Sequence, residues 1–249
     1  MTAAIAAACI RLVTVAAAIL AVSEPVFAQN ISINLGEGGG LTERVVQLIA
    51  LLTVLTLAPS ILIMMTSFTR IVVVLSLLRT ALGTATAPPN AVIVSLSLFL
   101  TAFIMGPALQ SAYDSGIRPL INNEIGIEQA FERSSEPFKS FMLKNVREKD
   151  LQLFTDLSRA PAPTEADALS LRIVVPAFMI SELRRAFEIG FLLFLPFLII
   201  DLVVASVLMS MGMMMLPPVV VSLPFKLIFF VLVDGWTLVA GSLVQSYGS

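Results

Sequence analysis

The chain has 249 residues, of which 57% are hydrophobic and 13% are charged, and its formal net charge is -2. A mean hydropathy of +0.96 excludes an ordinary soluble domain. The absence of histidine excludes Ser-His and Cys-His catalytic sites and histidine-ligated zinc, and the absence of a basic cluster argues against nucleic-acid binding. A single cysteine, Cys9, cannot form an internal disulfide. We therefore expect an integral membrane protein without the common histidine-based hydrolase chemistry.

The first 28 residues have the pattern of a secretory signal peptide. Arg11 is followed by an apolar run over residues 12–22 and then by small or apolar residues that end at Ala28. We expect cleavage between Ala28 and Gln29, which leaves the mature N-terminus outside the cytoplasm. An uncleaved signal anchor is the alternative, because Arg11 is the only charge of a long n-region. An exposed, glycine-rich extracytoplasmic lead, residues 29–44, follows.

Residues 45–109 are predicted to form N-terminal hydrophobic helices. The run over residues 45–65 is long enough, at about 1.5 Å per residue, to cross a bilayer core of roughly 30 Å. It continues past Arg70 and Arg79, and hydropathy does not decide whether this stretch is one bent helix or two. Residues 91–109 form a second uncharged span. With the N-terminus outside, Arg70 and Arg79 fall on the cytoplasmic side, as the positive-inside rule requires.

Residues 110–178 are predicted to form an extracytoplasmic helical domain. More than half of the charged residues of the chain lie here. Apolar residues recur at helical spacing over residues 128–157, with Pro137 at an expected helix start. Residues 159–168 are predicted to be a loop. The charges are mixed and nearly balanced, which favours a solvated helical surface over a charged binding patch.

Residues 179–249 are predicted to form a C-terminal hydrophobic hairpin with a methionine-rich loop. Two spans, about residues 186–211 and 219–243, are joined by a short link, which brings the expected total to about four spans in an all-α, membrane-type fold. Methionine is flexible and adapts to irregular surfaces, although filling the membrane core would be the simplest use for it. A Cu(I) site has no cysteine or histidine to support it. The clustered methionines are Met209, Met211, Met213, Met214 and Met215.

Ionisable residues inside the apolar segments need a partner or a polar cavity. Asp201 and Lys226 lie at similar depth in the hairpin, which predicts an ion pair within one chain or between neighbouring copies; alternatively, each faces water separately. An aspartyl dyad of Asp201 and Asp234 lacks a Gly-x-Gly-Asp context. Other polar residues expected to be buried are Arg70, Arg79 and Asp234, and the remaining ionisable residues are Glu182, Arg184, Arg185 and Glu188.

Four long stretches, residues 64–90, 176–191, 195–218 and 223–236, resemble the FliP/SctR family of bacterial export-gate proteins. The resemblance covers almost the whole mature chain and favours the flagellar branch over the virulence branch. It implies a pore-forming subunit of the flagellar type III protein export gate, assembled as a helical oligomer in the bacterial inner membrane at the flagellar basal body. A subunit of this kind is expected to be no enzyme and to hold no cofactor. The implied partners are further copies of the chain, FliQ, FliR, FlhB, the FlhA export platform, membrane lipids and unfolded flagellar export substrates.

The same resemblance implies roles for individual residues. The five methionines match a loop that acts as a gasket around the pore, and Asp201 and Lys226 match a charged pair at subunit contacts. Arg70 and Arg79 match polar positions without a clear individual role. Two other readings remain: a small-solute transporter built on broken helices, and a structural assembly factor whose methionines only pack.

Overall fold

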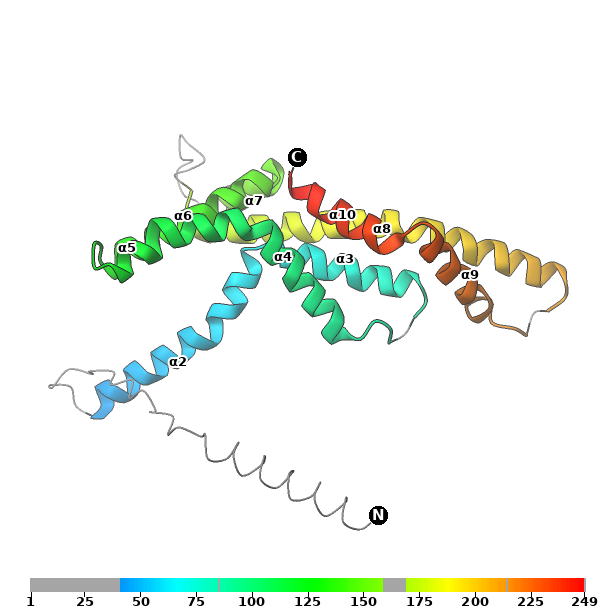
Figure 1. The fold of residues 1–249 in the computed structure, drawn as a ribbon, viewed down its shortest axis with the longest axis horizontal. Helices are drawn as coiled ribbons and strands as arrows, with labels where there is room; N and C mark the ends of the chain where they lie inside the picture. The colour runs from blue at the N-terminus through cyan, green and yellow to red at the C-terminus, as the bar shows by residue number, and fades with distance from the viewer. Residues whose placement is uncertain (1–40, 85, 159–168, 214, 249) are drawn as a thin grey trace, which may run out of the picture. The chain divides into compact units, whose positions relative to one another are not determined.

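The computed structural model shows an all-α chain (Figure 1). All regular secondary structure in the residues that it describes is helical, so the predicted fold class is confirmed. The chain divides into two compact units, Met1–Leu52 and Thr53–Ser249, and the packing described below is that of the second unit. The expected signal peptide and its cleavage site at Ala28 and Gln29 lie outside the described residues. The described ranges are 41–84, 86–158, 169–213 and 215–248.

The first hydrophobic stretch forms two helices, which hydropathy had left undecided. Helix α2 (Leu41–Met64) ends at a short break, and α3 (Phe68–Ala81) follows it. In the break, the hydroxyl of Thr66 donates to the carbonyl of Ile63 at 3.1 Å and so pairs one of the last carbonyls of α2. Hydroxyl side chains compete in this way with the helix for backbone partners. The helix is interrupted at Thr66 and Ser67, two successive residues with hydroxyl side chains.

Helix α4 (Asn90–Ala112) continues without a loop through a π-helical turn, η1 (Tyr113–Ile117), into α5 (Arg118–Ile121). The boundary expected at residue 109 therefore falls inside a continuous helix. Residue 116, in the π-helical turn, is a glycine because α6 passes too close to leave room for a side chain. A Cβ atom there would lie 2.6 Å from the backbone oxygen of Ala130.

Helices α6 (Ile127–Asn145) and α7 (Glu148–Ser158) form most of the polar segment. The expected helix start at Pro137 is wrong, since α6 begins ten residues earlier, after Gly126. Pro137 has no N–H to bond the carbonyl of Arg133, one turn before it. The hydroxyl of Ser115 donates to that carbonyl instead, at 3.1 Å, which lets the helix continue through the proline. The predicted loop over residues 159–168 lies outside the described residues.

The C-terminal part contains one long helix and a bent pair. Helix α8 (Leu171–Ser210) has 40 residues and runs without a break through the boundary expected at residue 178. Helices α9 (Pro218–Leu232) and α10 (Gly235–Gly248) are bent by 62°. By length and composition, the described residues contain two helices able to cross a membrane, or three if the bent pair is one span, against about four expected. These two helices are Asn90–Ile121 and Leu171–Ser210, while α2 adds only a shorter apolar stretch, Leu48–Leu57.

Helix α3 is the centre of the larger apolar cluster. Its buried residues Ile71, Val74, Leu75 and Leu78 follow the spacing of one helical face, and this face packs along α8. Phe197 of α8 joins the cluster, as do residues of α4, α9 and α10. A second cluster joins α6 to the first turns of α8 around the buried residues Met65, Met142, Leu169, Ile173, Val174 and Phe178.

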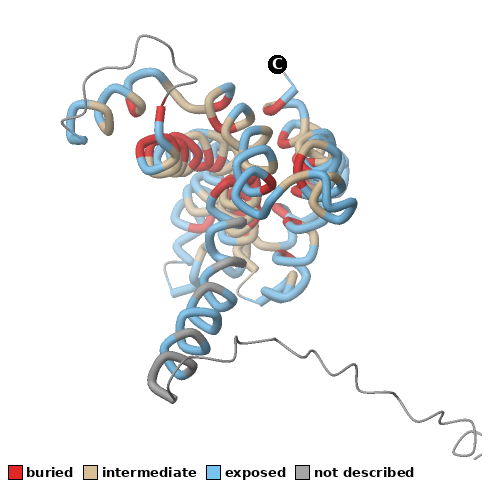
Figure 2. Tube along the Cα trace, turned by 90° about the vertical axis from the view of Figure 1, so that its left-hand side faces the viewer, coloured by how far each residue is buried: buried red, intermediate tan, exposed pale blue. Residues whose placement is uncertain are grey.

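Much of the length of the helices is exposed, as the pale-blue turns in Figure 2 show, and many of the exposed side chains are large and apolar. Only 11% of the most apolar window of α8 and 17% of that of the α4–α5 helix is buried in this chain. Phe99 and Phe103 of α4 and Phe191 of α8 are among the exposed side chains. Apolar surface of this extent marks contact with lipid or with other protein chains.

Gly190 allows α8 to approach α3, and it provides a test of this packing. A Cβ atom at Gly190 would lie 2.3 Å from Cδ1 and 3.2 Å from Cβ of Leu77. We expect Gly190→Ala to lower the free energy of unfolding by about 1 to 3 kcal/mol through overpacking. Thermal unfolding in detergent measures this. Gly106→Ala in α4, where a Cβ meets nothing within 4 Å, is the matched control and should be neutral or stabilising. Equal effects of the two changes would contradict the close approach.

Candidate functional site

The methionine-rich turn follows the end of α8 in a defined backbone geometry. Gly212 has a φ of 76°, in the left-handed region that favours glycine. The N–H of Met213 donates to the carbonyl of Leu208 at 3.0 Å, and the N–H of Gly212 donates to that of Met209 at 3.1 Å. These two hydrogen bonds form a Schellman motif, which satisfies the last carbonyls of the helix and reverses the chain. The position of the turn is therefore set by the helix end itself.

The methionines around this turn are exposed. Met209, Met211 and Met213 are 58%, 65% and 41% exposed, and Met215 is 99% exposed. Met214 lies outside the described residues. Helix α9 begins directly after Pro217, so the exposed methionines occupy the tip of the α8–α9 hairpin (Figure 1). In this chain they are available for contacts with a partner.

Asp201 and Lys226 form an ion pair within one chain, at the root of this hairpin. Nζ of Lys226 lies 2.6 Å from Oδ2 of Asp201, and the side chain of Lys226 is only 4% exposed. Nζ also donates to the backbone carbonyl of Ala81 at 3.1 Å. The hydroxyl of Ser222 donates to the other carboxylate oxygen of Asp201 at 2.5 Å. These four residues, which we call the hairpin clamp, join α8 and α9 to the last residue of α3.

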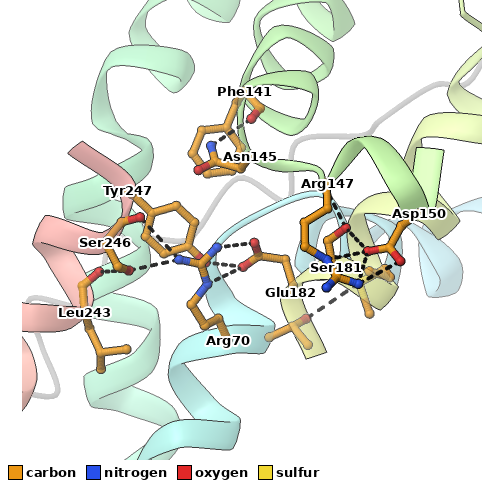
Figure 3. A network of polar contacts seen from close by, with 12 residues as sticks. Arg70, Phe141, Asn145, Arg147, Asp150, Ser181, Glu182, Leu243, Ser246 and Tyr247 are labelled. Atoms are coloured by element: carbon orange, nitrogen blue, oxygen red, sulfur yellow. Dashed lines mark hydrogen bonds and ion pairs between the residues drawn. The ribbon is translucent and has the colours of Figure 1, made fainter. Parts of the chain in front are cut away.

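A second ion pair is completely buried where α3, α8 and α10 meet (Figure 3). The guanidinium of Arg70 pairs with the carboxylate of Glu182, with 2.9 Å between Nε and Oε2. Arg70 also donates to the hydroxyl of Ser246 at 2.9 Å and lies over the ring of Tyr247, 3.8 Å from its centroid. The hydroxyl of Tyr247 donates to Glu182. Paired and hydrogen-bonded in this way, two charges can be held in an apolar interior.

Next to this network, α7 is attached to α8 by a polar contact (Figure 3). The hydroxyl of Ser181 donates to Asp150 at 2.7 Å, and Arg147 forms an ion pair with the same carboxylate. Burial favours the neutral form of Asp150, but the hydrogen bonds from Ser181 and Arg147 and the charge of Arg147 outweigh it and hold the pKa of this carboxyl below its usual value. Asp150 is therefore charged at neutral pH.

The other two polar residues expected to be buried have different environments. Arg79 is half-buried at the end of α3, and it donates to the side chain of Asn90 at 2.6 Å and to the carbonyl of Pro88 at 3.2 Å. It thus links the end of α3 to the start of α4. Asp234 is exposed in this chain, so its expected burial is wrong here. It occupies the turn between α9 and α10 with a φ of 51°, a conformation that aspartate tolerates.

Sequence reasoning missed the buried network. Glu182 stood out as an ionisable residue in an apolar segment, but neither its partner nor a role followed from the pattern. Arg70 lies 112 positions before Glu182, and Tyr247 lies 65 positions after it. Two opposite charges, each placed in an apolar helix, were the only signal that could have suggested a pair.

Together, the fold and these contacts define a class: an all-α, membrane-type protein whose helices are joined by buried ion pairs and which presents an exposed methionine turn. Comparison with known proteins agrees. The sequence model of the FliP family matches residues 51–243 of this chain. This chain belongs to the FliP family.

Curated relatives agree along most of the chain, and each is named flagellar biosynthetic protein FliP. The relative from Caulobacter vibrioides is 66% identical over 217 residues, which cover 87% of this chain and 82% of the relative. That from Rhizobium meliloti is 50% identical over 243 residues, 96% of this chain and 99% of the relative. That from Bacillus subtilis is 55% identical over 202 residues, 81% of this chain and 91% of the relative.

Neutralising Glu182 tests the buried pair. We expect Glu182→Gln to destabilise the fold by about 3 to 5 kcal/mol, because it leaves the charge of Arg70 buried without a counterion. Tyr247→Phe keeps the ring and removes one hydrogen bond to a charged group, so a loss of about 1.5 to 3 kcal/mol is expected. The matched control is Glu188→Gln on the same helix: its ion pair with Arg184 is 57% exposed on both sides and should contribute less than about 1 kcal/mol.

Thermal unfolding in detergent compares these variants. The double variant Arg70→Met with Glu182→Leu removes both charges and should recover part of the lost stability. If Glu182→Gln were no more destabilising than Glu188→Gln, the buried pair would not support the fold.

Charge reversal tests the ion pair of the hairpin clamp. We expect Asp201→Lys to impair assembly, because two cations then meet at the hairpin root. Adding Lys226→Asp should restore assembly in part only, since the new carboxylate faces the carbonyl of Ala81, to which Lys226 now donates. Recovery of the assembled complex from detergent-solubilised membranes measures this. Failure of the double reversal to restore any assembly would count against a direct pair.

Proposed function

We propose that this chain is a pore-forming subunit of the flagellar type III protein export gate and that its methionine turn acts as a deformable gasket. Membership in the FliP family supports the broader part of the proposal, a component of flagellar biosynthesis and protein export. The observation that carries the finer part is the exposure of the methionines at the tip of a hairpin with a fixed root.

The physical demands of export favour methionine at this position. A gate for unfolded chains must exclude ions when idle and yet admit many different side chains. Thioether side chains are apolar and flexible, so they close on one another and also adapt to cargo. Leucine would pack more rigidly, and charged residues would bind cargo and its counterions.

The exposed apolar helices support an oligomeric gate in the membrane. Surfaces such as those around Phe99 of α4 and Phe191 of α8 need cover from lipid or from other subunits. The partners that we propose are further copies of this chain, FliQ, FliR, FlhB, the FlhA export platform, membrane lipids and unfolded flagellar substrates. The proposed location is the bacterial inner membrane at the flagellar basal body, with residues 110–178 outside the cytoplasm.

Replacing Met213, Met214 and Met215 together tests the gasket. With alanine, volume is lost at the tip, and we expect ion leakage to rise while the complex still assembles. With leucine, the apolar volume is kept but the flexibility is reduced, so leakage should stay low while secretion of flagellin falls. The measurements are ion flux into vesicles and flagellin in the culture medium.

Met64→Ala is the control, since Met64 is 43% exposed but lies on α2, far along the chain from the turn. Unchanged leakage in the alanine variant of the turn, with assembly intact, would favour methionines that only pack in a structural assembly factor. Uptake of small solutes by the isolated protein would favour a transporter instead.

A further inference from the structure

Ser222 is a buried serine in an otherwise apolar helix, and its side chain faces a carboxylate on another helix. It is completely buried on α9. Its hydroxyl lies 2.5 Å from Oδ1 of Asp201 and 3.1 Å from the carbonyl of Val219, one turn earlier in its own helix. A hydroxyl has one proton to donate. The closer and charged acceptor is the stronger one, so the proton goes to Asp201.

Ser222 and Lys226 hold the two oxygens of one carboxylate. They are four residues apart on α9 and therefore share one face of the helix. Ser222 donates to Oδ1 of Asp201, while Lys226 pairs with Oδ2. A carboxylate held at one oxygen can rotate about its bond, whereas one held at both oxygens cannot do so without losing a contact. Ser222 thus determines the orientation of Asp201, and Lys226 fixes the pair to Ala81 of α3.

Alongside the hairpin clamp and towards the methionine turn, an apolar groove of about 470 Å³ lies between α8 and α9. Val203 and Val207 line it from α8, and Val221 and Phe225 line it from α9. Apolar contacts across a groove do not fix a spacing. The hairpin clamp is therefore the polar contact nearest to the turn that sets the distance between the two helices in the described residues.

We propose that Ser222 is a positioning residue of the export gate: by holding Oδ1 of Asp201, it sets the spacing of the α8–α9 hairpin and so the position of the methionine turn. The proposal rests on the proposed function of that turn as a seal. Without the hydroxyl, the carboxylate of Asp201 can rotate while it keeps its contact with Lys226. The distance between α8 and α9 then varies over a wider range.

The test compares Ser222→Ala with a matched change elsewhere. Ser97→Ala in α4 also replaces a completely buried serine in an apolar helix, but the hydroxyl of Ser97 donates only to the carbonyl of Ile93 in its own helix. Ser222→Thr keeps the hydroxyl and should rescue. All variants are made in the full chain and assembled into the complex, with Cys9 replaced by serine so that labels attach only where cysteines are introduced.

The first measurement is the distance distribution between spin labels at Val207 and Val220, which are both exposed and lie on the two arms of the hairpin. Ser222→Ala should broaden it, while Ser97→Ala and Ser222→Thr should not. The second measurement is ion leakage in vesicles. Ser222→Ala should raise it about tenfold, the factor that corresponds to one hydrogen bond to a charged group.

The two measurements separate the inference from the proposed function. An unchanged distance distribution in Ser222→Ala overturns the positioning role, whatever the leakage. A broadened distribution without increased leakage, in a protein where alanine at Met213 to Met215 does leak, overturns the link between Ser222 and the seal. If those methionine replacements also leave leakage unchanged, the proposed function fails. The distance distribution then still tests whether Ser222 positions the hairpin.

Discussion

The buried ion pair between Arg70 and Glu182 is the contact on which the arrangement of α3, α8 and α10 depends. Apolar faces attract one another without specifying a register, whereas a buried charge is tolerated only where its partner stands. Because the hydroxyls of Tyr247 and Ser246 complete the hydrogen bonds of this pair, the C-terminal helix is fixed to the same point. A shift of α3 against α8 by one turn would leave a charge unpaired in an apolar interior, and a shift of α10 would remove the hydrogen bonds that its hydroxyls make to the pair.

The hairpin clamp adds a second polar contact at the other end of α3. Arg70 lies near the first residue of α3, and Lys226 donates to the carbonyl of Ala81, the last residue of the helix. The bent pair α9–α10 is therefore attached at both ends of α3, with apolar side chains packed between the two attachments. The bend itself occurs at Asp234, whose left-handed backbone turns the chain by 62° between α9 and α10.

This arrangement suits the export gate that we propose. The body of the chain is held by buried polar contacts, while the hairpin tip is apolar and exposed. Among the described residues, the hairpin clamp is the polar contact between α8 and α9 that lies nearest to this tip. Flexible thioethers on a fixed support can adapt to each passing chain and return to contact afterwards. The outward faces of α4 and α8 remain apolar in the single chain, and lipid or neighbouring subunits would cover them in the proposed gate.

The sequence alone determined the features that are local: the all-α class, the apolar helices, the methionine turn, and the similar depth of Asp201 and Lys226 in one hairpin. It failed at Pro137, where the hydroxyl of Ser115 replaces the missing backbone donor and lets a helix pass. It also failed at Asp234, and it left Glu182 without a partner. The periodicity of apolar residues and the length of apolar segments depend only on residues that are close together in the sequence. The tertiary structure decided which buried charges meet across more than a hundred positions, because that depends on how helices pack and not on the residues beside each charge.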